Sequence, residues 1–255
     1  MSQEPLVLYH KNGPVVTVTL NRPEKLNAVT GELHHQLNSA LRKFNADPET
    51  YIVVLNANGR SFCAGRDIAA QAKSDQPVTA HVDPETTQFG VIPVEKLIVT
   101  SCRGHAIGVG GYMAMYGDIR VVSDTFHFAL TELPTAMLGP YWMGQVEGLP
   151  RAVAFRLAIG DRFTNEELKQ WGLVTEVVPD AALESATQRW VDYLLSLPRQ
   201  HLLETKRLMK EFGNQYSRED YKKEMEVRAH LDALSDTREA ALAFVEKRKP
   251  KFTGS

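Results

Sequence analysis

The chain has 255 residues, 43% of them hydrophobic and 24% charged, which fits a globular protein of one large domain or one domain with an appendage. Its formal net charge of −2 gives no electrostatic reason to expect nucleic acid as a partner, and no apolar run reaches the ~18 residues of a membrane span. The two cysteines form no disulfide framework and the first residues lack the features of a signal peptide, so we expect a cytoplasmic protein.

The first half of the chain alternates strand and helix patterns. Residues 6–10 and 15–20 flank Asn12-Gly13, which predicts a β-hairpin. Apolar residues at helical spacing predict a helix after Thr30: Leu33, Leu37, Leu41 and Phe44. Short β-branched runs predict three further strands: 52–55, 97–101 and 119–122. This alternation indicates βα units. The polar segment 69–90 contains two prolines and is predicted to be a mobile loop over a site.

The second half is almost entirely helical in pattern from residue 142, interrupted only by the strand-like run 174–178. Three amphipathic helices are predicted, marked by Trp190, Leu194 and Leu197, by Leu202, Leu203 and Leu208, and by Tyr221, Met225 and Leu231. Asp236 and Glu239 have the spacing of a capping box, which would open a last helix through Val245. The basic segment 246–252 is either a solvated tail or a contact for an anionic ligand.

Two glycine-rich turns each follow a predicted strand, at 61–68 and at 104–111. The second, Gly-His-Ala-Ile-Gly-Val-Gly-Gly, leads into a helical pattern, where backbone N–H groups can face an anion or a developing oxyanion. Met113 stands where a dinucleotide fingerprint requires glycine, and no Gly-Lys-Ser/Thr follows, so neither common nucleotide motif is present. Both segments are equally compatible with tight turns that serve packing alone.

In their order and spacing, segments 21–28, 61–68 and 104–118 resemble the crotonase superfamily, the enoyl-CoA hydratases and isomerases. Segments 171–174 and 244–248 extend the resemblance over essentially the whole chain. The resemblance implies an α/β fold, a crotonase-type ββα spiral with a C-terminal helical trimerisation region. We place the spiral core at 1–200 and the helical region at 201–255, and we expect a homotrimer or a dimer of trimers.

The resemblance also implies an acyl-CoA substrate whose thioester enolate is stabilised by two backbone N–H groups, those of Arg66 and Val109. Coenzyme A is then part of the substrate, and no separate cofactor is expected. Residues expected to contact CoA are Lys25, Leu26, Ala64, Asp67, Ile68 and Lys247. Asp67 has a second interpretation, as a residue that caps its turn. No metal site is expected, because His105 and His127 have no further ligand at metal-binding spacing.

The carboxylates are expected to decide the reaction. Hydratases of the superfamily usually have two catalytic glutamates, and here Tyr112 occupies the first position whereas Glu132 matches the second. A phenol with a pKa of about 10 is a poor general base at pH 7. A single carboxylate can still move a proton from C2 to C4 of a 3-enoyl thioester. Glu132 is therefore expected to be the one catalytic base of a Δ3,Δ2-enoyl-CoA isomerase in fatty acid metabolism.

Pro140-Tyr141-Trp142 follows Glu132 and resembles the aromatic segment of such isomerases. We expect Tyr112, Phe128, Tyr141 and Trp142 to line the substrate pocket and exclude water, although Tyr141 and Trp142 are also typical core residues. The alternative function is an enoyl-CoA hydratase or another crotonase-type hydrolase or lyase, in which Tyr112 or Glu147 assists Glu132. A non-enzymatic acyl-CoA-binding protein is the third hypothesis. Cys63 is expected to be a small buried residue.

Overall fold

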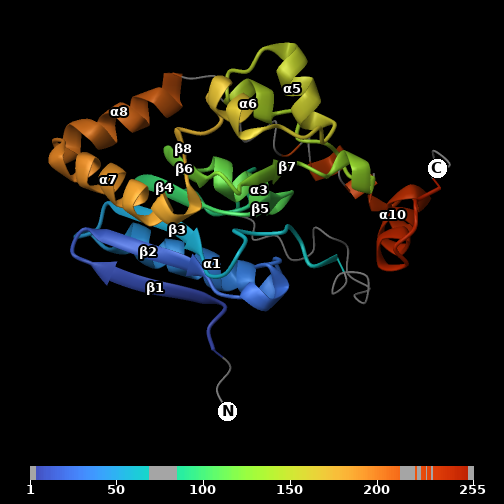
Figure 1. The fold of residues 1–255 in the computed structure, drawn as a ribbon, viewed down its shortest axis with the longest axis horizontal. Coiled ribbons are helices and arrows are strands. Elements are labelled where there is room, and N and C mark those ends of the chain that lie inside the picture. The colour runs from blue at the N-terminus through green and yellow to red at the C-terminus, as the bar shows by residue number, and fades with distance from the viewer. Residues whose placement is uncertain are drawn as a thin grey trace.

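A computed structural model describes residues 4–68, 85–212, 222, 225–227, 229–230 and 232–251. Its largest layer is a six-stranded sheet in the order β1-β2-β3-β4-β6-β8 (Figure 1). The strands are β1 (Val7–Asn12), β2 (Val15–Leu20), β3 (Ile52–Ala57), β4 (Leu97–Cys102), β6 (Ile119–Ser123) and β8 (Glu176–Val178). The hairpin β1–β2 is antiparallel and all other neighbours are parallel, which confirms the predicted hairpin and βα units.

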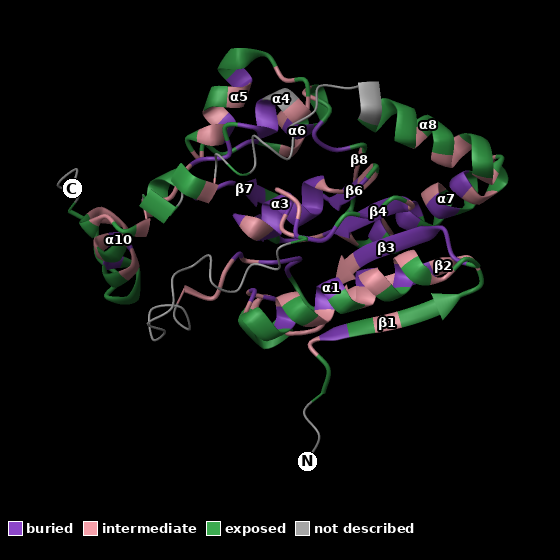
Figure 2. Ribbon diagram, turned by 180° about the vertical axis from the view of Figure 1, so that it is seen from behind, coloured by how far each residue is buried: buried purple, intermediate pink, exposed green. Residues whose placement is uncertain are grey.

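Helix α1 (Gly31–Ala46) connects β2 to β3 and begins where the sequence predicts. The Thr30 side chain accepts a hydrogen bond from the Leu33 N–H and so caps the first turn. The predicted apolar face is fully buried: Leu33, Leu37, Leu41 and Phe44. This stripe covers the part of the sheet nearest the hairpin, as seen in Figure 2.

A second, two-stranded parallel sheet consists of β5 (His105–Ile107) and β7 (His127–Ala129). Helix α3 (Val109–Met115) follows β5 after a single glycine. The sequence pattern indicated a turn at this position and missed both strands, because three-residue strands are too short to show periodicity. The small sheet and α3 place the glycine-rich segment at the centre of the molecule, among residues that are mostly buried (Figure 2).

The second half is helical apart from β8, as predicted. Its helices are α4 (Met143–Val146), α5 (Arg151–Ala158), α6 (Asn165–Gln170), α7 (Leu183–Ser196), α8 (Arg199–Phe212) and α10 (Ser235–Val245). Val191 and Leu194 of α7 are buried against β3 and β4, and Leu202 of α8 joins the same cluster. The division of the chain at residue 200 stays a prediction. Within the described part of the chain, no helix has the length and hydropathy that a membrane span requires.

The predicted capping box of the last helix is wrong. Helix α10 begins at Ser235, so Asp236 already lies in its first turn, and Leu234 is the capping residue without a side-chain hydrogen bond. The true capping box joins Thr164 and Glu167 at the start of α6. Of the other predicted elements, loop residues 69–84 and the helix markers 221 and 231 lie outside the described residues.

Candidate active site

The two glycine-rich turns run side by side in the fold. The Cys63 N–H donates to the His105 carbonyl at 2.8 Å, and the Ile107 N–H donates to the Cys63 carbonyl at 3.0 Å. Gly65 has a φ of +93°, and a Cβ there would lie only 3.0 Å from the Ile107 oxygen. Glycine is therefore required for this close approach. The convergence of the two turns, which spacing alone could not establish, is a feature of the tertiary structure.

Asn27 holds the 61–68 turn in place from the N-terminal side. It is completely buried, and its amide nitrogen donates to the carbonyls of Asn58 at 3.0 Å and Ser61 at 2.9 Å. Its side-chain oxygen accepts from the Arg22 N–H at 2.7 Å. Leu26, beside it, accepts a hydrogen bond from the Ala64 N–H at 2.9 Å. Sequence reasoning used Asn27 only as part of a motif and missed this positioning role.

The residues on either side of Arg66 pair with Val29. The Val29 N–H donates to the Gly65 carbonyl at 2.8 Å, and the Asp67 N–H donates to the Val29 carbonyl at 3.0 Å. In this parallel bridge the N–H of Arg66 itself points away from Val29. The Asp67 carboxylate forms an ion pair with Arg22 at 2.8 Å. This partly buried pair supports the interpretation of Asp67 as a residue that stabilises the turn.

Val109 is the first residue of α3, where backbone N–H groups have no acceptor within the helix. Its side chain packs against Gly90, whose φ is +76° and where a Cβ would lie 2.6 Å from Val109 Cγ2. The Gly90 carbonyl is in turn hydrogen-bonded to His34 Nε2 at 2.9 Å. The β-branched side chain of Val109 thus fits beside Gly90, and helix α3 begins at Val109.

The Glu132 carboxyl group lies at the start of α3. Glu132 is 6% exposed, and a Cβ on Gly108 would lie 3.3 Å from its Oε1 atom. The Glu132 carbonyl accepts hydrogen bonds from the N–H groups of Thr135 at 3.1 Å and Met137 at 2.8 Å. These bonds close the short helix η3 (Leu133–Thr135) and fix the backbone that carries the carboxylate. A buried carboxylate beside a helix N-terminus is a suitable arrangement for proton transfer next to a stabilised oxyanion.

The expected aromatic residues occupy three different environments. Tyr112 and Trp142 are buried and lie together, with ring centroids 5.5 Å apart, and Phe89 packs edge-on against Trp142 at 5.2 Å. Phe128 is buried beneath α3, where it limits the space at Gly111. Tyr141 is 51% exposed, so it does not share the buried position of Trp142. Of the four, Tyr112 and Trp142 have their rings side by side in the structure.

Comparison with known proteins identifies the family. The model of the enoyl-CoA hydratase/isomerase family matches residues 10–255. The chain belongs to this family. It is therefore an enzyme of the crotonase superfamily that acts on acyl-CoA substrates, and the spiral fold expected from the sequence is confirmed.

Individual relatives of this crotonase enzyme have different reactions in their names. The chain is 27% identical to the 1,2-epoxyphenylacetyl-CoA isomerase of Escherichia coli, over 97% of this chain and 98% of the relative. It is 29% identical to the (E)-benzylidenesuccinyl-CoA hydratase of Thauera aromatica, over 94% and 96% respectively. A crystal structure of a carnitinyl-CoA hydratase from Mycobacterium avium is similar, with a TM-score of 0.86, 26% identity and coverage of 99% of this chain and 100% of that one.

Glu147 does not have the surroundings of a second base in this crotonase. Both of its carboxylate oxygens accept hydrogen bonds from the Arg120 guanidinium, at 2.7 and 3.0 Å. The two side chains are 9% and 14% exposed. A carboxylate held by a bidentate, largely buried ion pair is part of the scaffold, because removing its charge would leave the Arg120 guanidinium without a counter-charge.

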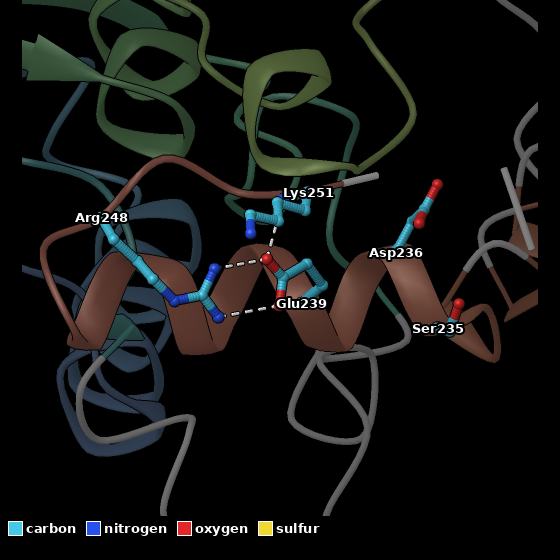
Figure 3. A pocket seen from close by; sticks show the side chains of 5 residues that line it. All are labelled: Ser235, Asp236, Glu239, Arg248 and Lys251. Atoms are coloured by element: carbon cyan, nitrogen blue, oxygen red, sulfur yellow. Dashed lines mark hydrogen bonds and ion pairs between the residues drawn. The ribbon is translucent and has the colours of Figure 1, made fainter. Parts of the chain in front are cut away.

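The basic segment that follows α10 folds back onto this same helix. Figure 3 shows the Arg248 guanidinium and the Lys251 backbone N–H at the Glu239 carboxylate, with Ser235 and Asp236 lining the same pocket. The hydrogen bond from Arg248 lowers the pKa of Glu239 to about 2. Lys247 is exposed just beyond α10, as is Lys25 in the short helix η1 (Pro23–Lys25). These two lysines are the expected CoA contacts that have freely accessible ammonium groups.

Cys63 is a small buried residue, as predicted. Burial raises the pKa of its thiol to about 12, so the thiol stays protonated at neutral pH. Its role is packing: a Cβ on Gly110 would lie 2.8 Å from its Sγ atom. The first turn of α3 and the 61–68 turn thus fit against each other through small residues on both sides.

Proposed function

We propose that this crotonase enzyme moves the double bond of a 3-enoyl-CoA to position 2, with Glu132 carrying the proton. The observation that supports the proposal most directly is the placement of the Glu132 carboxylate against Gly108, at the start of α3. The partner carboxylate that hydratases usually have is replaced by Tyr112, whose phenol is a poor base at neutral pH. One base suffices for this isomerisation.

The proposed reaction has two proton transfers and no net change in composition. Glu132 removes a proton from C2, and the electrons of the C2–H bond move into the conjugated system to form a dienolate. The thioester oxygen carries the negative charge and accepts hydrogen bonds from the N–H groups of Arg66 and Val109. Glu132 then returns the proton to C4, which leaves the double bond between C2 and C3. The contribution of such an oxyanion hole is typically ~10²–10³ in rate for each donor.

Tyr112 and Trp142 are proposed to favour proton transfer over hydration. Their buried rings are in contact, and Trp142 packs against Phe89, whose ring in turn lies 5.1 Å from that of Tyr116. Such an aromatic wall leaves little room for a water molecule positioned to attack C3. Phe128 would contribute from beneath α3, and Tyr141 only if a bound substrate or a second subunit covers it.

Hydration is the second candidate, because the names of several relatives at similar identity specify hydratases. One assay separates the two functions: the purified enzyme is incubated with 3-hexenoyl-CoA and, separately, with 2-hexenoyl-CoA. We expect 2-hexenoyl-CoA from the first and little 3-hydroxyhexanoyl-CoA from the second. Faster hydration of 2-hexenoyl-CoA than isomerisation of 3-hexenoyl-CoA would refute the isomerase proposal.

The CoA part of the substrate is proposed to lie along the 22–29 and 61–68 segments. Leu26 and Ala64 are joined by a backbone hydrogen bond, and Asp67 and Ile68 continue the same turn. Lys25 and Lys247 are placed to attract the CoA phosphates, Lys247 from the same or a neighbouring subunit. We also propose that the enzyme is cytoplasmic and that it forms a trimer or a dimer of trimers.

A further inference from the structure

The backbone after Glu132 forms a tight turn that carries the carboxylate. The Met137 N–H donates to the Glu132 carbonyl at 2.8 Å, and the Ala136 N–H donates to the Leu133 carbonyl at 3.0 Å. Ala136 has the left-handed conformation, with φ +58°. A residue with a Cβ is unfavourable in this conformation, which persists only where the surrounding structure holds it. The position of the proposed base therefore depends on the groups that hold Ala136.

The end of helix α5 supports the turn on one side. Gly160, two residues after α5, has φ +80°, and an added Cβ would lie 2.7 Å from the Leu130 carbonyl oxygen and 2.8 Å from Pro134 Cγ. Leu130 precedes Glu132 by two residues, and Pro134 belongs to η3. This packing supports the chain as far as Pro134, and Ala136 lies beyond it.

Helix α10 contacts the turn at Ala136. The half-buried Thr237, in the first turn of α10, donates its hydroxyl hydrogen to the Ala136 carbonyl at 3.1 Å. This carbonyl and the Met137 N–H belong to one peptide group. Thr237 therefore holds the oxygen of this group, and the Glu132 carbonyl accepts the hydrogen bond from its nitrogen. A planar peptide group bound at both ends is fixed in orientation.

The chain beyond α10 keeps this helix in shape. An isolated helix of 11 residues is marginally stable in water. The Arg248 N–H donates to the Ala243 carbonyl at 3.0 Å and so closes the last turn. The Arg248 side chain and the Lys251 N–H bind the Glu239 carboxylate, as Figure 3 shows. These bonds stabilise the helix that presents the Thr237 hydroxyl.

We propose that Thr237 is a positioning residue for Glu132: its hydroxyl fixes the Ala136–Met137 peptide group and, through it, the backbone that carries the carboxylate. Without the hydroxyl this peptide group is free to rotate, which relieves the left-handed conformation of Ala136. The carboxylate then spends less time beside Gly108, and catalysis is sensitive to displacements on the order of 1 Å. The inference rests on the proposed function, in which Glu132 is the base.

The test compares Thr237→Val, which keeps the shape of the side chain and removes the donor, with Thr237→Ser, which keeps the donor. We expect Thr237→Val to lower kcat with 3-hexenoyl-CoA ~10-fold, while the Kd of acyl-CoA stays within ~2-fold of wild type. Thr237→Ser should restore most of the turnover. Thr205→Val on α8 is the matched control, because the exposed Thr205 hydroxyl also donates to a backbone carbonyl, that of His201 at 2.7 Å.

Hydrogen exchange gives a second measurement, which does not depend on activity. In Thr237→Val the Met137 N–H should exchange at least ~3-fold faster than in wild type, because its peptide group has lost one of its two bonds. Thr205→Val should leave this exchange unchanged. Mass spectrometry of a peptide that contains Met137 provides the rates, and circular dichroism shows that each variant is folded.

Equal kcat values for Thr237→Val and Thr205→Val would overturn the inference, as would unchanged exchange at Met137. A loss in Thr237→Ser as large as in Thr237→Val would also overturn it, because packing and not the hydroxyl would then be decisive.

Glu132→Gln separates this inference from the proposed function. Wild-type turnover in Glu132→Gln would refute the proposed role of Glu132, whereas exchange at Met137 would still decide whether Thr237 holds the peptide group. A loss in Glu132→Gln without any loss in Thr237→Val would refute the positioning role alone. If the wild-type enzyme hydrates 2-hexenoyl-CoA instead of isomerising 3-hexenoyl-CoA, the same variants are compared on that substrate.

Discussion

Replacing Glu132 with Gln keeps the shape of the side chain but removes the group that can take a proton. We expect isomerase turnover with 3-hexenoyl-CoA to fall at least ~10²-fold, the lower end for general acid–base catalysis, while acyl-CoA binding measured by calorimetry changes little. Tyr112→Phe should be much milder, because the phenol takes no part in proton transfer. If the two variants lose equal activity, the one-base mechanism is wrong.

Gly108 offers a second test at the residue scale, because a methyl group there would meet the carboxylate. The residue has φ +52° and ψ −123°, and an added Cβ would lie 3.3 Å from Glu132 Oε1. Gly108→Ala should cost ~1–3 kcal/mol of stability through backbone strain and should also lower turnover strongly. Gly13→Ala is the control: its φ is +56° and nothing lies within 4 Å of the added Cβ, so turnover per folded molecule should be unchanged.

At the scale of elements, Arg120 on β6 joins the sheet to the helical layer. Besides Glu147, just after α4, its guanidinium binds the carbonyls of Gly117 at 2.9 Å and Leu173 at 3.2 Å. Arg120→Met leaves a buried carboxylate without its partner, and we expect a loss of ~3–5 kcal/mol in urea unfolding. Arg189→Met breaks the exposed pair with Glu176 and should cost less than ~1 kcal/mol.

The double variant Arg120→Met/Glu147→Leu serves as the internal check on this prediction. Replacing both charges by apolar side chains removes the uncompensated carboxylate, so most of the lost stability should return. A double variant as unstable as Arg120→Met alone would mean that the contacts of Arg120 with the backbone carbonyls, and not the ion pair, are the decisive ones.

At the scale of the whole molecule, several large apolar side chains on the helices face outward. Phe155 is 66% exposed, Met209 72% and Phe244 57%, and they lie on α5, α8 and α10. Helix α10 itself extends away from the sheets, as Figure 1 shows. Exposed apolar surface of this kind is typical of subunit contacts. We expect a trimer or a dimer of trimers in light scattering, and a monodisperse monomer at micromolar concentration would contradict this.

The C-terminal tail provides a second prediction at this scale. Thr237 of α10 donates to the Ala136 carbonyl at 3.1 Å, so the first turn of α10 lies near the segment that follows Glu132. The tail folds back along this helix, where the Lys251 N–H donates to Glu239 at 2.8 Å. Removing residues 247–255 should weaken acyl-CoA binding and reduce its salt dependence, because basic groups near the CoA phosphates are lost. Lys247→Gln should reproduce part of the effect, and Lys169→Gln on α6 should not. Unchanged affinity and salt dependence after the truncation would exclude a role for the tail.

Local patterns in the sequence were sufficient for most elements. The face of α1 follows from four apolar residues at helical spacing, and its start follows from Thr30. The strands β5 and β7 could not be found in this way, because each has only three residues and they pair with each other across 22 positions of the chain. The failed capping box at Asp236 has a similar cause: Arg248, nine residues further on, binds the carboxylate of Glu239 that the motif required.

The sequence by itself determined the family, the βα order of the core and the identity of the one carboxylate proposed as base. It determined these because turn glycines, apolar periodicity and the replacement of Glu by Tyr112 are properties of single positions and their near neighbours. Only the tertiary structure decided that the two glycine turns meet and that Glu132 lies against Gly108. It also decided that Glu147 forms an ion pair with Arg120 and that Tyr141 is exposed. Each of these depends on which distant groups share a buried space, and burial is settled by the packing of the whole chain.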